Sequence, residues 1–293
     1  MTYPCLWSVI IYAACATGLA AVVKTYLVLT CGKVKTDKTL NDHVVIITGA
    51  NREDIINQSK NENILVHHLD LCSLTSVRKF AREIISTENR LDVLVNNAGA
   101  HIKENYKTED GLQIGMQINH YGPFLLTYLL IDLLKKSAPS RIVHVSSILH
   151  RLGRVECDNM NCEKSFNDLK VYFNSKLYNL ICSNEMARRL SETRVTSNSL
   201  HPGVVKTDLF RNMPFAWKCS MKVLGLFLKT SKEGAQTTIY LSISDEVEGV
   251  SGKYFVDCKE VTPSVTARDE KIARELWDKC CDLVGLKVEE RNI

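Results

Sequence analysis

The feature that most constrains the fold is an alternation between short β-branched runs and longer stretches with helical periodicity. The short runs end in small or polar residues and span 43–47, 64–69, 91–95, 141–147 and 195–200. Helical patterns stand between most of them, at 73–84, at 112–134 and from 171 onward. This alternation predicts βαβ units, a parallel sheet and the α/β fold class. Such sheets place their chemistry at the carboxyl ends of the strands.

Bulk properties indicate one globular domain. The 293 residues are 45% apolar and 24% charged, with no linker or repeat after residue 40. The net charge of +4 is mild, and no basic stripe carries interleaved aromatic residues, which argues against a nucleic-acid partner. The eleven cysteines form no Cys-x-x-Cys pair and no Cys/His zinc spacing. We therefore expect reduced thiols in a reducing compartment and no bound metal.

The first segment differs from the rest because residues 5–23 are apolar or small except for Ser8 and Thr17. After Lys24 the apolar stretch continues, which is enough for one membrane span of about 20 residues. A cleaved signal peptide and a buried core helix are the alternatives. Lysines at 33, 35 and 38 follow the segment, so the positive-inside rule places the remainder in the cytosol. We expect a membrane anchor at 1–32 and a catalytic domain at 40–293.

Tyr172 and Lys176 lie four residues apart in a helical pattern, so the ammonium should stack beside the phenol. A cation there would lower the tyrosine pKa from about 10 toward neutrality and suit it to pass a proton. One Tyr-x-x-x-Lys is expected by chance in a lysine-rich chain with ten tyrosines, and alone it would be an ordinary exposed pair. Its weight comes from the preceding strand, which delivers Ser146 and Ser147 at its carboxyl end.

Several strand-end motifs occur in a specific order, and together they resemble the short-chain dehydrogenase/reductase family from about residue 40 onward. They are Thr48-Gly49-Ala50-Asn51, Leu69-Asp70-Leu71, Asn96-Asn97-Ala98-Gly99, Asn119-His120, Ser146-Ser147, Tyr172 with Lys176, and His201-Pro202-Gly203. The amino-acid sequences of residues 133–143, 234–237 and 252–260 resemble those of the retinol dehydrogenase branch.

The resemblance implies a Rossmann-like doubly wound sheet and an enzyme anchored in the endoplasmic reticulum membrane with its domain facing the cytosol. It implies NADP(H) as cofactor and hydride transfer that interconverts a small lipophilic alcohol with an aldehyde or ketone, as for retinol and retinal. An apolar stretch at 213–228 would form the substrate lid, with simple core or membrane contact as alternatives.

Carried over by position, the family's catalytic residues are Asn119, Ser147, Tyr172 and Lys176. Tyr172 would be the acid/base, and Ser147 would donate a hydrogen bond to the reacting oxygen. Lys176 would lower the tyrosine pKa and hold the nicotinamide ribose. Asn119 would hold a water that links Lys176 to solvent.

The resemblance assigns cofactor binding to residues that follow the strands. They are Gly49, Asn51, Asp70, Leu71, Asn97, Ala98, Gly99, Tyr172, Lys176, Pro202, Gly203, Val205 and Thr207. Structural alternatives exist for several: Asp70 as a helix-entry residue, Asn97 as a strand-end bridge, and Pro202-Gly203 as a simple turn.

The chain departs from the family after its first strand. The glycine-rich phosphate loop is missing, because Glu53 and Ile55 stand where later glycines belong. The span from Thr48 to Asn96 is also short by roughly thirty residues, about one βαβ crossover. The sheet should therefore be incomplete at its first βαβ unit, without the segment that selects NADP over NAD. We expect the run at 64–69 to pair directly with the first strand; the alternative is a gap in the sheet.

Two functions follow from these observations. The first is an NADP(H)-dependent oxidoreductase, supported by the four catalytic positions. The alternative is a catalytically impaired, truncated variant with at most a binding or regulatory role, because Glu53 and Asp54 would repel a diphosphate.

Overall fold

The computed structural model describes residues 24–25, 30–50, 55, 59, 61, 63–205, 228–291 and 293. Most of the expected anchor and lid lies outside these residues, as do Asn51 and Thr207. No helix within the described ranges has the length and apolarity that a membrane crossing requires.

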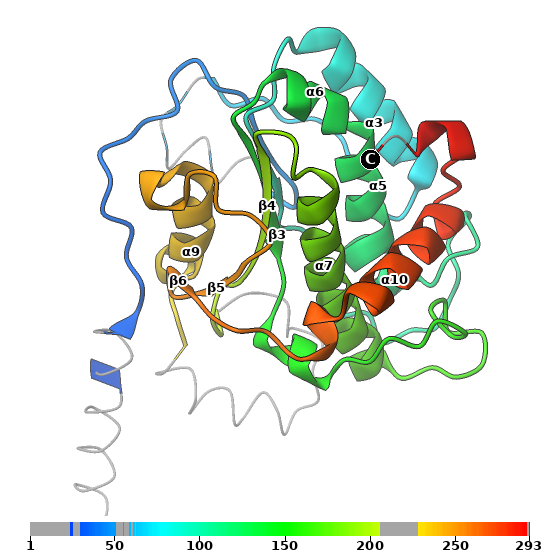
Figure 1. The fold of residues 1–293 in the computed structure, drawn as a ribbon. Helices are drawn as coiled ribbons and strands as arrows, with labels where there is room; N and C mark the ends of the chain where they lie inside the picture. Colours follow the sequence, from blue (N-terminus) through cyan, green and yellow to red (C-terminus); the bar gives the residue numbers. More distant parts are fainter. Residues whose placement is uncertain are drawn as a thin grey trace, which may run out of the picture.

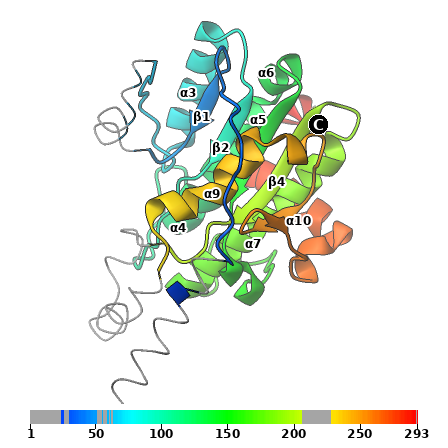
Figure 2. The ribbon, with the colours of Figure 1, turned by 90° about the vertical axis from the view of Figure 1, so that its left-hand side faces the viewer.

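The centre of the described chain is a sheet with the strand order β1-β2-β3-β4-β5-β6 (Figures 1 and 2). The strands are β1 (Val45–Ile47), β2 (Val93–Asn96), β3 (Ser140–Val145), β4 (Val195–His201), β5 (Tyr254–Val256) and β6 (Lys259–Glu260). The first five are parallel, and β6 returns antiparallel beside β5. The predicted parallel, Rossmann-like sheet is confirmed, because the runs predicted at 43–47, 91–95, 141–147 and 195–200 contain the neighbouring parallel strands β1 to β4.

Helices cover both faces of the sheet, as Figure 1 shows. The longer helices are α3 (Leu74–Thr87), α5 (Gly122–Leu129), α7 (Asp168–Arg189), α9 (Ser231–Ile243) and α10 (Glu270–Leu283). The short ones are α4 (Ile114–Met116), the π-turn η1 (Gln117–Tyr121), α6 (Ile131–Lys136), η2 (Ile148–Leu152), η5 (Asp245–Val247), η6 (Thr266–Arg268) and η7 (Val288–Glu290). Helices α3, α5, α7 and α10 share one large apolar core, and α9 packs on β2, β3 and β4. Residues 31–40 run along α9 (Figure 2). The Val34 amide donates a hydrogen bond to the Gln236 side-chain oxygen, and the Lys38 ammonium forms an ion pair with Asp245.

Capping residues fix where the main helices begin. Ser73 accepts a hydrogen bond from the Ser76 amide and starts α3 within the helical pattern predicted at 73–84. Asn167 does the same for α7 through the Lys170 amide. Thr230 and Glu233 form a capping box at the start of α9.

The helix expected over 112–134 is confirmed in outline, since the chain is helical from Ile114 to Lys136, but the π-turn η1 separates α4 from α5, and Leu130 separates α5 from α6. Pro123 has no N–H, so the Asn119 carbonyl four residues earlier loses its helical donor. The Gly122 amide reaches back to Gln117, which gives the wider π-turn. The Asn179 side-chain nitrogen of α7 replaces the missing backbone donor and donates a hydrogen bond to the Asn119 carbonyl at 2.9 Å.

The strand expected at 64–69 is wrong, because this segment lies outside the sheet, and β1 forms the edge among the described strands. Leu65 is 72% exposed, and Ile47 of β1 is 53% exposed. The segment is held on α3: His67 lies 2.9 Å from the Glu83 carboxylate and edge-on to Phe80. These contacts with α3 take the place of the expected pairing with β1.

Candidate functional site

The carboxyl ends of β1 and β2 interlock through Thr48. Its hydroxyl accepts hydrogen bonds from the Asn97 and Ala98 amides, both at 3.0 Å. The Asn97 side chain returns a bond to the Thr48 carbonyl at 3.0 Å. Gly49 has φ +77°, and a Cβ there would lie 2.8 Å from the Ala98 Cα, so the approach requires glycine. Gly49, Asn97, Ala98 and Gly99 therefore lie together at one strand end.

Asn119 faces this strand end from the η1 turn. Its side-chain oxygen accepts from the Ala100 amide at 2.7 Å, and its nitrogen donates to the Ala100 carbonyl at 2.8 Å. The side chain thereby holds the loop after β2. The water-holding role expected for Asn119 has no counterpart in these contacts and stays a prediction.

The two serines after β3 have different partners. The Ser146 hydroxyl donates to the Lys176 carbonyl at 2.7 Å and joins the strand end to α7. The Ser147 hydroxyl caps η2 through the Leu149 amide and shares a hydrogen bond with Tyr172. The Ser147 carbonyl contacts the buried His150 ring at 2.7 Å. Ser147, and not Ser146, is therefore the serine that faces the tyrosine.

Tyr172 and Lys176 are both buried on α7, beside the end of β3. The Lys176 ammonium donates to the Val145 carbonyl at 3.0 Å and lies 5.7 Å from the Tyr172 ring centroid. It also lies close to the loop after β2, since a Cβ at Gly99 would come within 3.2 Å of it. The structure thus brings Asn119, Ser147, Tyr172 and Lys176 to one place.

The expected lowering of the tyrosine pKa is wrong for the protein without cofactor. Burial raises the pKa of Tyr172 to about 12, and the hydrogen bond with Ser147 only partly offsets this. Burial also lowers the pKa of Lys176 to about 8. Desolvation is the dominant cause of both shifts, because both groups are withdrawn from water.

Pro202, Gly203 and Val205 follow β4, and Lys229 holds this turn. Gly203 has φ +89°, and a Cβ there would lie 2.6 Å from the Lys229 side chain. The Lys229 ammonium approaches the Pro202 carbonyl at 3.4 Å and pairs with Asp257. Sequence reasoning missed Lys229 and Asp257, because nothing in their spacing links them to this turn.

His101 is a further residue that the sequence did not indicate. Its ring lies edge-on to Tyr172 with centroids 6.3 Å apart, and its Nε2 is 3.1 Å from the Asp168 carboxylate. Only the position of His101 after the Asn97–Gly99 motif could have pointed to it.

Asp70 and Leu71 lie away from the tyrosine. The Asp70 carboxylate accepts from the Cys72 amide at 2.8 Å, within the turn that leads into α3. Leu71 is buried against Gly122. These contacts are those of a helix-entry turn, and they leave the exposed Asp70 side chain at the surface.

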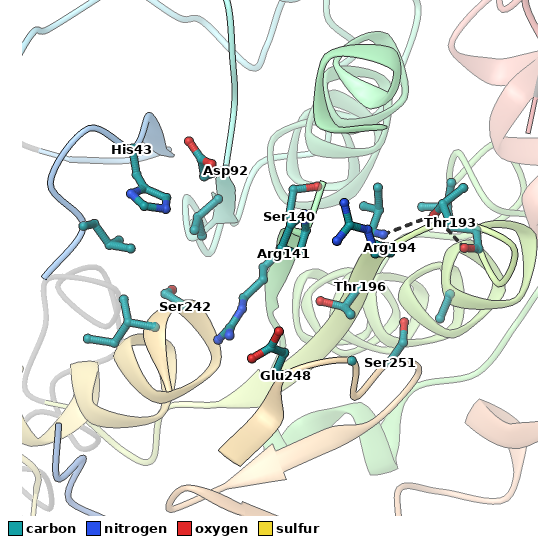
Figure 3. A pocket seen from close by; sticks show the side chains of 18 of the residues that line it. His43, Asp92, Ser140, Arg141, Thr193, Arg194, Thr196, Ser242, Glu248 and Ser251 are labelled. Carbon is teal, nitrogen blue, oxygen red and sulfur yellow. Dashed lines mark hydrogen bonds between the residues drawn. The ribbon is translucent and has the colours of Figure 1, made fainter. Parts of the chain in front are cut away.

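A surface hollow of about 330 Å³ lies elsewhere, at the opposite ends of the strands (Figure 3). Asp92, Ser140 and Arg141 line it, and they stand where β2 and β3 begin. A smaller hollow of about 90 Å³ lies between α7 and residues 156–167. The Tyr172 group belongs to neither hollow.

The described residues fit the nicotinamide end of a dinucleotide. Gly99 has no side chain and leaves open the space beside the Lys176 ammonium and Asn119 that a Cβ would fill. Hydroxyl, phenol and ammonium groups converge there, which suits a ribose and a reacting carbonyl. Among the residues expected near the phosphates of the cofactor, Gly49 lies within the described part of the chain.

Comparison with known proteins agrees with the resemblance found in the sequence. The family model described as short chain dehydrogenase matches residues 34–215. Human retinol dehydrogenase 14 is 51% identical over 226 residues, covering 76% of this chain and 67% of the relative. Human retinol dehydrogenase 11 is 42% identical over 81% of this chain and 74% of its own length. Human retinol dehydrogenase 13 is 36% identical over 307 residues, covering 92% of each chain. Because 307 exceeds 293, that alignment includes positions that only the relative fills.

Solved structures share the fold. An uncharacterised protein from Mycobacterium paratuberculosis has a TM-score of 0.59 and 28% identity over 75% of both chains. An NAD(P)-dependent gluconate 5-dehydrogenase from Beutenbergia cavernae, solved with NADP, has a TM-score of 0.55 over 70% of this chain and 78% of that chain. At 20% identity, the latter likeness concerns the fold alone.

Proposed function

Because the chain belongs to the short-chain dehydrogenase family of oxidoreductases, we propose that it interconverts a lipophilic, retinoid-like alcohol and its aldehyde or ketone with NADP(H). One observation carries this proposal. Buried Tyr172, hydrogen-bonded to Ser147, lies beside the Lys176 ammonium at the carboxyl end of β3. The substrate class rests on the retinol dehydrogenases among its relatives.

In the reducing direction Tyr172 gives its phenolic proton to the carbonyl oxygen of the substrate. Ser147 donates a hydrogen bond to the same oxygen and stabilises the charge that grows on it. Lys176 stabilises the resulting phenolate, and Asn119 keeps the neighbouring loop in place through Ala100. NADP(H), when bound, supplies the hydride, and the residues near Gly99 and Lys176 would hold its nicotinamide end.

The choice of NADP over NAD and a place at the endoplasmic reticulum membrane belong to the proposal as well. Both rest on the resemblance to retinol dehydrogenases and on the apolar amino-terminal segment. Fluorescence microscopy with an organelle marker and carbonate extraction test the location. Release by carbonate would contradict an anchor.

The impaired variant is the second candidate, and the edge of the sheet favours it. The span from Thr48 to Asn96 is shorter than expected by about one crossover, and among the described strands β1 forms the edge of the sheet, where the family's second strand would lie. Glu53 and Asp54 place negative charge after the first strand, where the pyrophosphate would arrive.

Thermal unfolding of the full chain with NADPH decides between the two. Binding at a hundred times Kd should stabilise the protein by about 2.7 kcal/mol and raise its Tm. Oxidation of NADPH in the presence of retinal then tests turnover. A flat Tm at millimolar NADPH, with NADH as the parallel titration, would favour the impaired variant.

A further inference from the structure

A second group of reactive side chains lies in the core, away from Tyr172. His120 of η1, Cys182 of α7 and Cys280 of α10 come from distant parts of the sequence. One ring nitrogen of His120 and the two sulfur atoms all lie within 4.8 Å of one another. All three side chains are buried. Their sequence separation explains why no zinc spacing is visible.

The His120 ring is oriented for a ligand at Nε2. Its Nδ1 lies 2.8 Å from the Asn179 side-chain oxygen, and the Asn179 nitrogen is committed to the Asn119 carbonyl. An amide oxygen only accepts, so Nδ1 carries the proton and Nε2 presents its lone pair. That lone pair faces the Cys280 sulfur at 3.1 Å. Metal-binding histidines are commonly fixed in this way through their other nitrogen.

The charges of the group also suit a cation. Two thiolates and a neutral imidazole would balance a divalent ion and leave no net charge in the dry core. Two sulfurs and one nitrogen are donors that zinc accepts in proteins, with one position left open.

We propose that His120, Cys182 and Cys280 form a buried binding site for a single thiolate-seeking divalent metal ion of the zinc class. Zinc bond lengths of about 2.0–2.3 Å set donor separations of roughly 3.5 Å in a tetrahedron, so small side-chain shifts would complete the site. The ion would join α10 to η1 and α7. This proposal is independent of the proposed catalytic function.

The test is the zinc content of the full chain, purified in detergent under reducing conditions without chelator. After incubation with zinc chloride and desalting, mass spectrometry should find about one zinc ion per chain. Cys182→Ala and Cys280→Ala should lose this zinc. Cys281→Ala is the matched control, because Cys281 is the adjacent buried thiol outside the cluster, and it should keep the zinc.

Two readouts on the unaltered protein guard against variants that fail to fold. Cobalt(II) should give thiolate-to-metal charge-transfer absorption, and zinc should raise the Tm. Zinc content that is nil in the wild type, or equal in all variants, would overturn the site. So would peptide mapping that finds Cys182 and Cys280 joined as a disulfide in the freshly isolated chain, since the thiolates would then be consumed.

Discussion

The central strands of the sheet have a partner strand on each side, whereas β1, at the edge, has one partner among the described strands. All seven residues of β4 are buried, and β4 pairs with β3 on one side and β5 on the other. Strand β1 has three residues, and its one partner among the described strands is β2. The proposed proton-transfer groups stand on the complete part, at the end of β3 and on α7, whereas the expected phosphate side depends on β1. The proposed reaction centre is therefore supported by other strands than the expected phosphate side.

We expect the largest effect from a substitution at the proposed proton-transfer groups, beside the central strands. Tyr172→Phe should lower kcat by about 10²–10⁴-fold, because the proton donor is removed while the fold is kept. Steady-state oxidation of NADPH with retinal measures it, and NADPH binding should be unchanged. Tyr178→Phe is the control, since Tyr178 is buried on the same helix and its hydroxyl contacts the Glu156 amide at 3.4 Å. Near wild-type turnover in Tyr172→Phe would remove the proposed acid/base.

A matched pair of isoleucine-to-alanine substitutions compares the two regions directly. Ile142→Ala, at a fully buried position of β3, should cost about 2–5 kcal/mol of unfolding free energy. Ile47→Ala, at the exposed end of β1, should cost about 1 kcal/mol or less. Urea unfolding measures both. Equal costs would mean that β1 is covered in solution and that the comparison fails.

The pH dependence of stability tests the burial of Lys176. Its pKa is 10.5 in the unfolded reference and about 8 in the folded chain, so the unfolded chain binds the extra proton between these values. Stability should therefore rise with pH across this window, by at most roughly 3 kcal/mol. The difference in unfolding free energy between wild type and Lys176→Met, measured from pH 8 to 10.5, isolates the effect. Lys170→Met, at an exposed position of α7, should keep the wild-type slope.

The smallest effect concerns the charges after β1. Glu53→Gln with Asp54→Asn should tighten NADPH binding by about tenfold, or about 1.4 kcal/mol, because repulsion of the diphosphate is relieved. The gain should shrink as salt rises. Nicotinamide fluorescence measures the affinity. Glu248→Gln, beside the hollow at the opposite strand ends, should change nothing. No gain at low salt would place the phosphates elsewhere.

The central strands could be predicted from the sequence, whereas the arrangement beside β1 could not. Strands β2, β3 and β4 and helix α7 follow from apolar runs and helical periodicity, since these elements are buried on the faces that the pattern shows. The run at 64–69 has the same pattern, but contacts with α3 keep it outside the sheet, and a local pattern does not reveal such tertiary contacts. The Gly122-Pro123 pair was a visible sign of the π-turn in the predicted long helix. The raised pKa of Tyr172 could not be predicted, because the depth of burial is set by the tertiary fold.

Helix α10 has a consequence for synthesis on the ribosome. Its Trp277 is buried edge-on to Phe124 of α5, with ring centroids 4.9 Å apart, and lies 4.8 Å from the Arg189 guanidinium of α7. During translation the apolar faces of α5 and α7 emerge long before the helix that covers them. The nascent chain therefore carries this apolar surface uncovered until α10 is synthesised, and exposed surface of this kind favours aggregation.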